Sequence, residues 1–180
     1  MLEVNKIPTH IGYYLAGFTD GEGSFNVSFR PRDDFRIPWK VSLCFNVSQK
    51  DKVILALFKQ HLKCGTMRQR NDGIWYYEIN NLIAINQNLI PFFKKFHFLS
   101  AKKKRDFCKF QQIAEIINQQ KHLTEQGIQE ILKIRRDMND GGKRKFSENE
   151  IIQKLPTKKS SETTRQAPDN NQGDDIVHTV

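Results

Sequence analysis

The sequence predicts an α+β fold in which helices cover one face of a four-stranded antiparallel sheet. Segments with alternating apolar and polar residues occur in two pairs, and a short polar connection joins the two segments of each pair, as in β-hairpins. Segments with helical spacing stand before, between and after these pairs, which gives the order α-β-β-α-β-β-α-α. Because no helix separates the strands of a pair, we expect antiparallel pairing, with one sheet face under the helices and the other in solvent.

The first helix and the first hairpin follow one another without a linker. Helical spacing runs over residues 11–19, and Pro8 and Thr9 precede it as start signals. Residues 24–30 and 40–48 then alternate between apolar and polar side chains. We expect them to pair as two half-buried strands, joined by the polar stretch between them.

A second helix leads into the second hairpin. Residues 50–63 have helical spacing, and Gly65 is expected to end this helix as a left-handed cap. The strands expected at 66–70 and 74–79 flank Asn71-Asp72-Gly73, a strong turn signal.

Three further segments complete a domain that we assign to residues 1–140. Residues 82–98 are predicted to be helical with an interruption at Pro91, because proline lacks the N–H that a helix interior needs. Residues 102–119 and 124–138 are predicted to form two longer helices.

Beyond this domain the sequence becomes polar. Residues 141–155 are expected to hold a short helix, since Ser147-Glu-Asn-Glu150 resembles a capping box. Residues 156–180 are rich in Ser, Thr, Asn and Asp with little to bury, which predicts a disordered tail.

The excess of basic residues favours a polyanionic partner such as nucleic acid. The 180 residues carry a net charge of +9. Residues 1–140 hold +8 of this charge, from 22 basic and 14 acidic side chains, so the basic part is the part expected to fold.

Other classes of protein find no support in the sequence. Cys44, Cys64 and Cys108 are scattered and match no metal-ligand spacing, so we expect buried free thiols in a reducing compartment. No segment is apolar and long enough to span a membrane, and the N-terminus has no signal-peptide pattern, so we expect neither membrane insertion nor secretion.

The end of the first helix carries two carboxylates, Asp20 and Glu22, each followed by a glycine. Carboxylates at a helix C-terminus oppose the helix dipole and are costly there unless a cation compensates them. Such a conflict between local preference and position is typical of a functional site. Ala16 and Gly17 leave part of the helix surface bare, so another helix could approach closely.

Three motifs in order resemble those of the LAGLIDADG homing endonucleases, over about residues 9–140. Leu15-Ala-Gly-Phe-Thr-Asp-Gly-Glu-Gly23 resembles the family signature, and Lys102-Lys-Lys-Arg105 lies where such proteins have a lysine-rich helix start. Residues 121–132 with Met138-Asn139 resemble a C-terminal segment common in intron-encoded members. The resemblance implies that the motif helix packs against a second copy and that the acid at its end binds a divalent metal over the scissile phosphates.

By its position in the motif, Glu22 is the expected metal ligand, with the Gly21 carbonyl as a second contact and Asp20 capping or positioning the helix ends. Hydrolysis of a phosphodiester needs neutralised charge at the attacking and leaving oxygens, and Mg²⁺ held by one or two carboxylates and the phosphates supplies it. One helix end offers too few carboxylates, so we expect a homodimer. The predicted interface residues are Gly12, Leu15, Ala16, Gly17 and Asp20. The alternative is that Asp20 and Glu22 are turn carboxylates in solvent.

Two further residues are candidates for catalysis. Gln49 matches a polar residue that orders water near the metals in related single-motif enzymes; the alternative is an exposed glutamine before a helix. Lys102 is the best match to the active-site lysine of the family, with Lys104 as the next candidate. The alternative for residues 102–105 is a basic helix start that contacts phosphates only.

The polar face of the sheet is the predicted surface for double-stranded DNA. Arg and Asn can read base edges in the major groove, whereas Ser and Lys mostly reach phosphates. The predicted DNA-binding residues are Ser24, Asn26, Ser28, Arg30, Arg32, Lys40, Ser42, Asn46, Ser48, Arg68, Arg70, Lys103 and Lys104. An ordinary solvent-facing sheet is the alternative, and the sequence does not decide whether Trp75 and Tyr77 or Tyr76 and Glu78 share this face.

These expectations combine in a magnesium-dependent, site-specific DNA endonuclease, a homodimer that cuts a long near-palindromic site and promotes intron mobility. An RNA-splicing maturase that binds intron RNA is one alternative. A DNA-binding regulator without catalysis is another, although the presence of Glu22 argues against it. The expected location is a chloroplast or mitochondrion if the intron lies there, and otherwise a bacterial cytoplasm.

Overall fold

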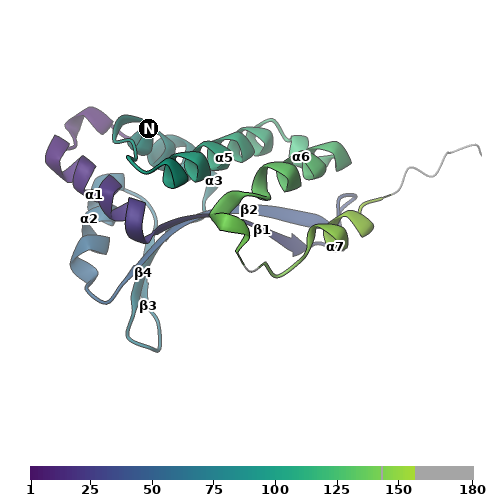
Figure 1. Cartoon of the computed structure of the whole chain (residues 1–180), viewed down its shortest axis with the longest axis horizontal. Coiled ribbons are helices and arrows are strands. Elements are labelled where there is room, and N and C mark those ends of the chain that lie inside the picture. The colour runs from purple at the N-terminus through teal and green to yellow at the C-terminus, as the bar shows by residue number, and fades with distance from the viewer. Residues whose placement is uncertain (143, 157–180) are drawn as a thin grey trace, which may run out of the picture.

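The computed structural model describes residues 1–142 and 144–156 and has the predicted α+β fold (Figure 1). Its sheet has the order β1-β2-β4-β3 with every neighbouring pair antiparallel. The strands are β1 (Gly23–Pro31), β2 (Trp39–Gln49), β3 (Thr66–Gln69) and β4 (Trp75–Ile79). Both predicted hairpins are therefore confirmed, and they join along β2 and β4.

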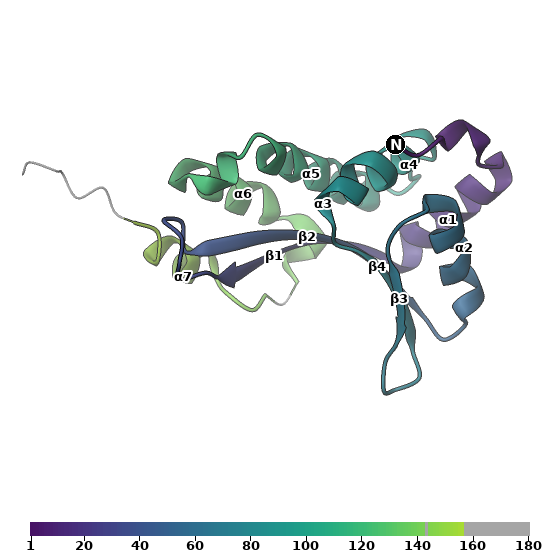
Figure 2. The same cartoon turned by 180° about the vertical axis from the view of Figure 1, so that it is seen from behind.

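The helices cover one face of this sheet, whereas the other face is open apart from the segment between η4 and α7 (Figures 1 and 2). The longer helices are α1 (Thr9–Glu22), α2 (Lys52–Leu62), α5 (Ala101–Asn118) and α6 (Glu125–Arg135). The shorter ones are η1 (Val4–Lys6), α3 (Leu82–Ala84), η2 (Ile85–Leu89), α4 (Ile90–Lys95), η3 (Lys121–Leu123), η4 (Met138–Gly141) and α7 (Glu148–Gln153). None of the helices in residues 1–142 and 144–156 is long and apolar enough to cross a membrane.

An aromatic cluster between the sheet and the helices forms the centre of the core. The ring of Phe25 on β1 is fully buried and lies 5.1–5.8 Å from rings on three other elements and the loop before α5. Each such ring buries a large apolar surface, and tilted or edge-on pairs add about 0.5–1.5 kcal/mol beyond that burial. Alternation in β1 thus fixes which face of the sheet meets the helices.

The segment from residue 82 to 95 is continuous, so the predicted interruption at Pro91 was wrong. The chain accommodates the proline by a π-helical turn at Ile85–Leu89. Pro91 has no N–H for the carbonyl of Gln87, and this carbonyl instead accepts a hydrogen bond from the N–H of Leu2 at 2.8 Å. The free carbonyl therefore ties the N-terminus to the helix.

The left-handed cap of α2 is Lys63, with φ 55°, rather than Gly65. Gly65 also has a positive φ of 79°, and a Cβ at this position would lie 2.6 Å from the ring of Tyr77. The glycine is therefore required where the chain turns into β3, two residues after the cap.

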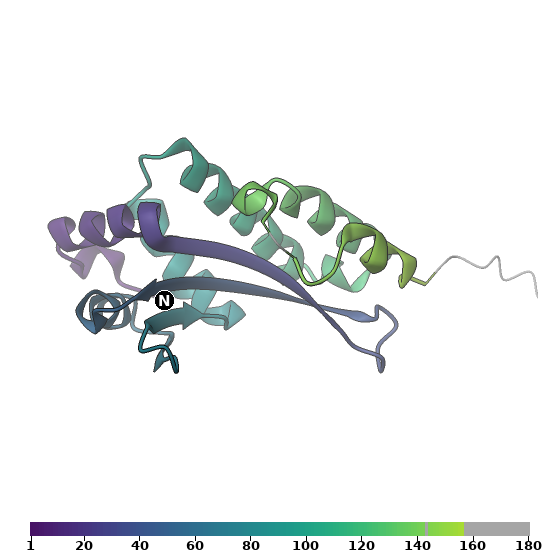
Figure 3. The same ribbon diagram turned by 60° about the horizontal axis from the view of Figure 1, so that its bottom comes forward.

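The free edge of β1 is closed by three side chains that reach its outward carbonyls. Lys103 Nζ donates to Gly23, Asn139 Nδ2 donates to Phe25 at 2.9 Å, and Arg135 Nη1 donates to Val27 at 3.3 Å. Figure 3 shows the C-terminal segment following this edge. An exposed strand edge invites pairing with other chains, and these contacts remove that possibility along half of β1.

The capping box predicted at Ser147 and Glu150 is present at the start of α7. The carbonyl of Ile151 accepts a hydrogen bond from Trp39 Nε1 at 3.0 Å, and Ile151 and Leu155 belong to the main core. The core therefore continues past residue 140. The disordered tail expected at 156–180 lies, beyond Pro156, outside the described residues.

Candidate functional site

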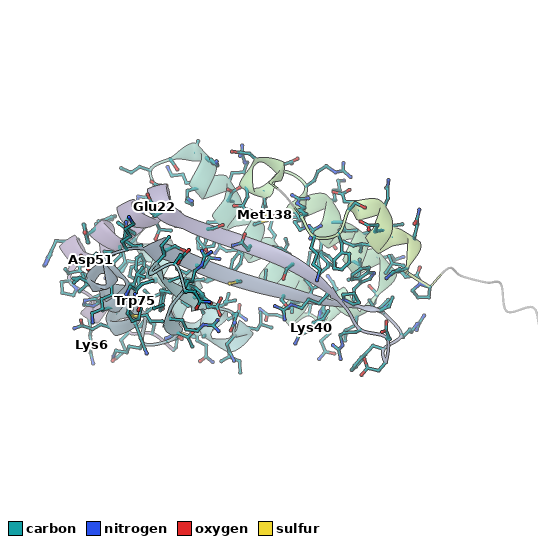
Figure 4. The ribbon with its side chains drawn as sticks, turned by 90° about the horizontal axis from the view of Figure 1, so that it is seen from below. Lys6, Glu22, Lys40, Asp51, Trp75 and Met138 are labelled. Carbon is teal, nitrogen blue, oxygen red and sulfur yellow. The ribbon has the colours of Figure 1, made fainter. Side chains whose placement is uncertain are left out.

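Helix α1 ends on an exposed acidic residue where it passes directly into β1 (Figure 4). Within residues 1–142 and 144–156, the Glu22 carboxylate takes part in no hydrogen bond and no ion pair. Gly21 beside it is also exposed, with no atom within 4 Å of the position that a Cβ would occupy. The motif therefore presents a free carboxylate and an open backbone.

Asp20, by contrast, is used within the chain. Its carboxylate accepts hydrogen bonds from the backbone N–H groups of Leu99 at 3.1 Å and Ser100 at 3.2 Å, and from the Ser100 hydroxyl at 2.6 Å. Ser100 is the N-cap of α5. Asp20 thus positions the start of α5, and its place at an interface between two copies stays a prediction.

The cation at the end of α1 is Lys103, which was predicted to contact DNA. Its side chain is buried, with an exposed fraction of 8%, and its ammonium donates to the Gly23 carbonyl. Burial lowers the pKa of Lys103, while the nearby carboxylates of Asp106, Asp20 and Glu22 oppose this shift. Lys103 therefore compensates the acidic helix end and is not a free phosphate contact.

The two neighbouring lysines point elsewhere. Lys102, predicted to be the active-site lysine, forms an ion pair with Asp140 on η4. Lys104 is exposed. Of the three lysines at the start of α5, Lys103 is the one whose ammonium bonds the Gly23 carbonyl after α1, and the predicted catalytic role of Lys102 or Lys104 stays a prediction.

Gln49 lies at the same end of the sheet as Glu22. Val47 is the register partner of Gly23, and β2 continues for two residues beyond it. The Gln49 Oε1 accepts a hydrogen bond from the N–H of Lys50 at 2.8 Å, so its amide N–H₂ remains available to a ligand.

The donors of a single chain do not suffice for a metal ion. No group of three or more His, Cys, Asp or Glu side chains that could hold a metal occurs in the described part of the chain. Glu22 is the free carboxylate of the motif, and Mg²⁺ needs additional oxygen ligands in an octahedral arrangement. The residues present fit a divalent cation once a second helix end and a phosphate contribute oxygens.

The predicted contact face of α1 is largely the wrong one. Leu15 and Ala16 are buried in the core of their own chain, and a Cβ on Gly12 would lie 2.3 Å from the ring of Phe96. Of the predicted interface residues, Gly17 is exposed and has no atom within 4 Å of its would-be Cβ. Ala16 therefore faces the core of its own chain, whereas Gly17 lies on the exposed side of α1.

The stripe on the outer side of α1 consists of the exposed Tyr14, Gly17 and Gly21 and the half-buried Phe18, at helical spacing. Tyr14 is 55% exposed, and Val53 on the neighbouring helix α2 is 60% exposed. The two glycines leave backbone open between these apolar side chains. The stripe can therefore accept a close helix partner.

The sheet face opposite the helices carries most of the predicted DNA contacts. The register pairs Ser24 with Asn46, Ser28 with Ser42, and Arg30 with Lys40. Ser48 pairs with Tyr76 and Asn46 with Glu78, while Tyr77 is fully buried, so Tyr76 and Glu78 share the polar face. We call the set Ser24, Asn26, Ser28, Arg30, Lys40, Ser42, Asn46, Ser48 and Arg68 the polar face.

Arg30 and Lys40 oppose one another directly across β1 and β2, and both are exposed. Neither forms an ion pair with a residue of the described chain. Like charges in such a cross-strand pair are destabilising, so their presence favours an external anion. This pair is the strongest electrostatic indication that the polar face binds a polyanion.

Arg68 is held in place by two neighbours on the same face. Its guanidinium forms a 2.5 Å ion pair with Glu78 and lies 5.2 Å from the centre of the Tyr76 ring. Sequence reasoning left the face of Glu78 open and did not name Cys44, since their place on this face follows only from the strand register.

Two other predicted arginines do not lie in the rows of the polar face. Arg70 follows β3 in the turn and pairs with Asp72 at 3.5 Å. Arg32 follows β1, and its guanidinium lies over the ring of Phe35 at 3.2 Å. Both nevertheless continue the hairpin ladder by one step, since the N–H of Arg32 donates to Pro38 and that of Arg70 donates to Ile74, and their contact with DNA stays a prediction.

Comparison with known proteins identifies the family of the chain. A family model described as LAGLIDADG endonuclease matches residues 15–114. "Probable intron-encoded endonuclease 2" of Neurospora crassa is 30% identical over 148 residues, which covers 76% of this chain and 32% of the relative. The chain spans about a quarter to a third of the length of this relative and two others.

Solved structures agree with the fold. The homing endonuclease I-LtrWI bound to target DNA has a TM-score of 0.71 at 30% identity, over 78% of this chain and 47% of that one. The archaeal intron-encoded homing endonuclease I-Vdi141I complexed with DNA also has a TM-score of 0.71, at 27% identity, over 80% of this chain and 92% of that one.

Proposed function

The chain belongs to the LAGLIDADG endonuclease family, and on this premise we propose that it is a site-specific homing endonuclease that cuts both strands of a long near-palindromic DNA site. The observation that carries the proposal is the free Glu22 carboxylate at the end of α1, next to a polar face with unpaired cations. A carboxylate there would repel DNA phosphates unless a metal ion stands between them.

The active site forms between two copies of the chain, packed through the stripe Tyr14, Gly17, Phe18 and Gly21. The open backbone at Gly17 and Gly21 supports this proposal, since nothing in the described chain fills the space beside them. The relative I-Vdi141I supports it as well, because it is matched over 92% of its length, as expected for a relative with one such domain per chain. Two Glu22 carboxylates would then face the two scissile phosphates.

Magnesium is the proposed cofactor. Glu22 of each copy and the Gly21 carbonyl would hold it together with DNA phosphate oxygens, a donor set of the hard oxygens that Mg²⁺ prefers. When bound, the metal supplies neutralising charge for the attacking and leaving oxygens of the phosphodiester. Gln49 would orient the attacking water through its free amide, and Lys103 would hold the end of α1 in position.

The polar face would lie in the major groove. Arg30, Lys40 and the serines would reach phosphates, while Arg68 and Asn46 can make paired hydrogen bonds to base edges. Because Glu78 already holds the guanidinium of Arg68, the arginine reaches the DNA with little loss of side-chain freedom.

The gene would lie in an intron and promote the spread of that intron. The name of the Neurospora relative, an intron-encoded endonuclease, supports this proposal. The enzyme would then act in the compartment that holds the intron, a chloroplast, a mitochondrion or a bacterial cytoplasm.

The test is a cleavage assay on the intron-less insertion site with magnesium, with and without a chelator. We expect Glu22→Gln to abolish cleavage and to leave DNA affinity intact, because Glu22 supplies charge to the metal and not to the DNA. Asp33→Asn, which removes one negative charge from the exposed β1–β2 connection, is the matched control. Cleavage by Glu22→Gln within about tenfold of the unchanged protein, a barrier difference of about 1.4 kcal/mol, would place the metal elsewhere.

The same assay separates the two alternatives. A maturase would bind and splice intron RNA without cutting the DNA site. A regulator would bind the DNA site and leave it uncut at every magnesium concentration.

A further inference from the structure

Asp106 on α5 is a buried carboxylate without a close partner in the described chain. Its exposed fraction is 1%, and its Oδ1 atom has no hydrogen-bond partner among residues 1–142 and 144–156. The Nε of Arg105 lies 4.0 Å from this oxygen, beyond hydrogen-bond distance, and Arg105 donates instead to Asp140 at 3.2 Å. A buried carboxylate is costly unless something compensates its charge, so Asp106 needs an explanation.

Lys103, one turn earlier on α5, is a buried cation on the same side of the helix. Side chains three positions apart on a helix are neighbours, with Cβ atoms about 5–6 Å apart. Both of these residues are buried, whereas Lys102, Lys104 and Arg105 around them are exposed. The Lys103 ammonium has three donors, of which one bonds the Gly23 carbonyl. The two buried groups therefore have unused donors and acceptors of opposite charge.

The charge of Asp106 acts on Lys103 more strongly than that of any other carboxylate. Burial lowers the pKa of Lys103, and among the charges that oppose this shift Asp106 comes first, ahead of Asp20 and Glu22. Asp20 already accepts three hydrogen bonds at the start of α5, and Glu22 is exposed. Asp106 is thus the carboxylate that compensates the ammonium inside the protein.

We propose that Asp106 is a positioning residue for the cleavage reaction, because its buried carboxylate holds the Lys103 ammonium at the Gly23 carbonyl. This carbonyl lies at the junction of α1 and β1, one residue after Glu22. An ammonium fixed there keeps the last turn of α1 in place, and a ligand supported in this way binds a metal better than a mobile one. The effect on cleavage rests on the proposed function, whereas the coupling of Asp106 to Lys103 does not.

The first experiment is a double-mutant cycle of unfolding in urea with Asp106→Asn, Lys103→Met and both changes together. With Lys103 present, we expect Asp106→Asn to lower the urea midpoint, because a buried ammonium loses its counter-charge. In the Lys103→Met protein the same change should raise the midpoint, because it removes a buried carboxylate that has lost its cation. Equal shifts in the two proteins would show that the residues are independent and would overturn the proposal.

The second experiment observes the Nζ resonance of Lys103 by ¹⁵N NMR in the full-length protein. A buried, hydrogen-bonded ammonium is shielded from proton exchange with water, so we expect Lys103 to give a sharp signal of its own. Asp106→Asn should broaden this signal, while Glu115→Gln, an equal loss of charge on an exposed residue of α5, should leave it sharp. A Lys103 signal like that of the exposed lysines in the unchanged protein would contradict a fixed ammonium, whether or not the variants fold.

The third experiment compares single-turnover cleavage by the folded Asp106→Asn and Glu115→Gln proteins over a range of magnesium concentrations. We expect Asp106→Asn to lower the cleavage rate at limiting magnesium by about tenfold or more, at unchanged DNA affinity, and Glu115→Gln to match the unchanged protein. A purely structural role for Asp106 would change the urea midpoint and leave cleavage by the folded protein unaltered. That result would overturn the positioning role.

The outcomes separate this proposal from the proposed function. A protein that shows the coupling and the Lys103 signal but never cuts DNA would overturn the endonuclease, and with it the effect on cleavage, while the coupling would stand. A protein that cuts its site although the two changes are additive would overturn the role of Asp106 and leave the endonuclease standing.

Discussion

Lys103 combines two demands that one surface lysine could not meet. Its ammonium donates a hydrogen bond to the Gly23 carbonyl at the β1 edge, and it places a positive charge near the carboxylates of Asp20, Glu22 and Asp106. The helix dipole makes Asp20 and Glu22 unfavourable at the end of α1, and the buried ammonium of Lys103 offsets this cost. The acidic end of the motif is therefore tolerated because of a residue 80 positions later.

We expect Lys103→Met to destabilise the fold by about 1–3 kcal/mol, because a buried carbonyl and nearby carboxylates lose their partner. Lys104→Met, an equal change on the exposed neighbour, should leave stability unchanged and weaken DNA binding at all sequences alike. Urea unfolding and DNA titration of both variants provide the measurement. Equal stability of the two variants would show that Lys103 is a surface lysine after all.

Cys44 lies on the polar face but should be chemically inert. Burial first, and then the charge of Glu78, raise the pKa of its thiol to about 11. Since the thiolate is the reactive form, almost none is present at neutral pH, and its fraction rises only as the pH approaches 11. Cys108 is exposed.

We therefore expect iodoacetamide to modify Cys108 well before Cys44 in the native protein at neutral pH. Modification of Cys44 should accelerate as the pH rises, and unfolding in urea should make the two rates similar. Mass spectrometry of timed samples gives both rates. Fast modification of native Cys44 at neutral pH would mean that the thiol does not have these surroundings.

At the scale of elements, the glycines of α1 separate an inner face from an outer face. Gly12 admits the ring of Phe96, whereas Gly17 borders open space. We expect Gly12→Ala to cost about 1–3 kcal/mol by overpacking. A smaller partner should relieve this, so Gly12→Ala combined with Phe96→Leu should cost less than the sum of the two single changes.

A thermal or chemical denaturation cycle over these four proteins measures the coupling. Strict additivity would mean that Gly12 does not contact Phe96 within its own chain. In that case the prediction that Gly12 lies at the dimer interface would stand.

The elements themselves could be predicted from sequence because their signals are local. Alternation in residues 24–30 and 40–48 depends only on neighbours along the chain, and the sheet reproduces it. The face of α1 could not be predicted, since a small residue permits close approach on either side. The choice between the faces is made by Phe96, which no pattern near Gly12 reveals.

The same limit applies to the site. Glu22 could be identified because the motif that carries it is contiguous. The choice among three consecutive lysines depends on the rotation of α5, which Asp20 fixes through Ser100. The position of Glu78 depends on the register between β2 and β4, which no local pattern fixes.

At the scale of the whole molecule, the two sides of the sheet have different roles. The apolar side faces the helices (Figure 1) and holds the aromatic core, whereas the polar side carries the exposed cations Arg30, Lys40 and Arg68. The acidic end of α1 lies at one end of the polar side. A single chain presents one free motif carboxylate on this side, and in the proposed dimer a second copy would supply the other.

We expect the unchanged protein to be a dimer at micromolar concentration by analytical ultracentrifugation, and Gly17→Leu to be a folded monomer. The leucine fits the monomer, because nothing in the described chain lies within 4 Å of the would-be Cβ, but it would separate two backbones that need close contact. Gln126→Leu, an equally exposed apolar change on α6 at the other end of the molecule, should remain dimeric (Figure 1). Since each monomer carries one Glu22, Gly17→Leu should also lose double-strand cleavage while keeping its circular dichroism spectrum. An unchanged protein that sediments as a monomer both alone and on its DNA site would contradict the two-chain active site, because one carboxylate cannot serve two scissile phosphates.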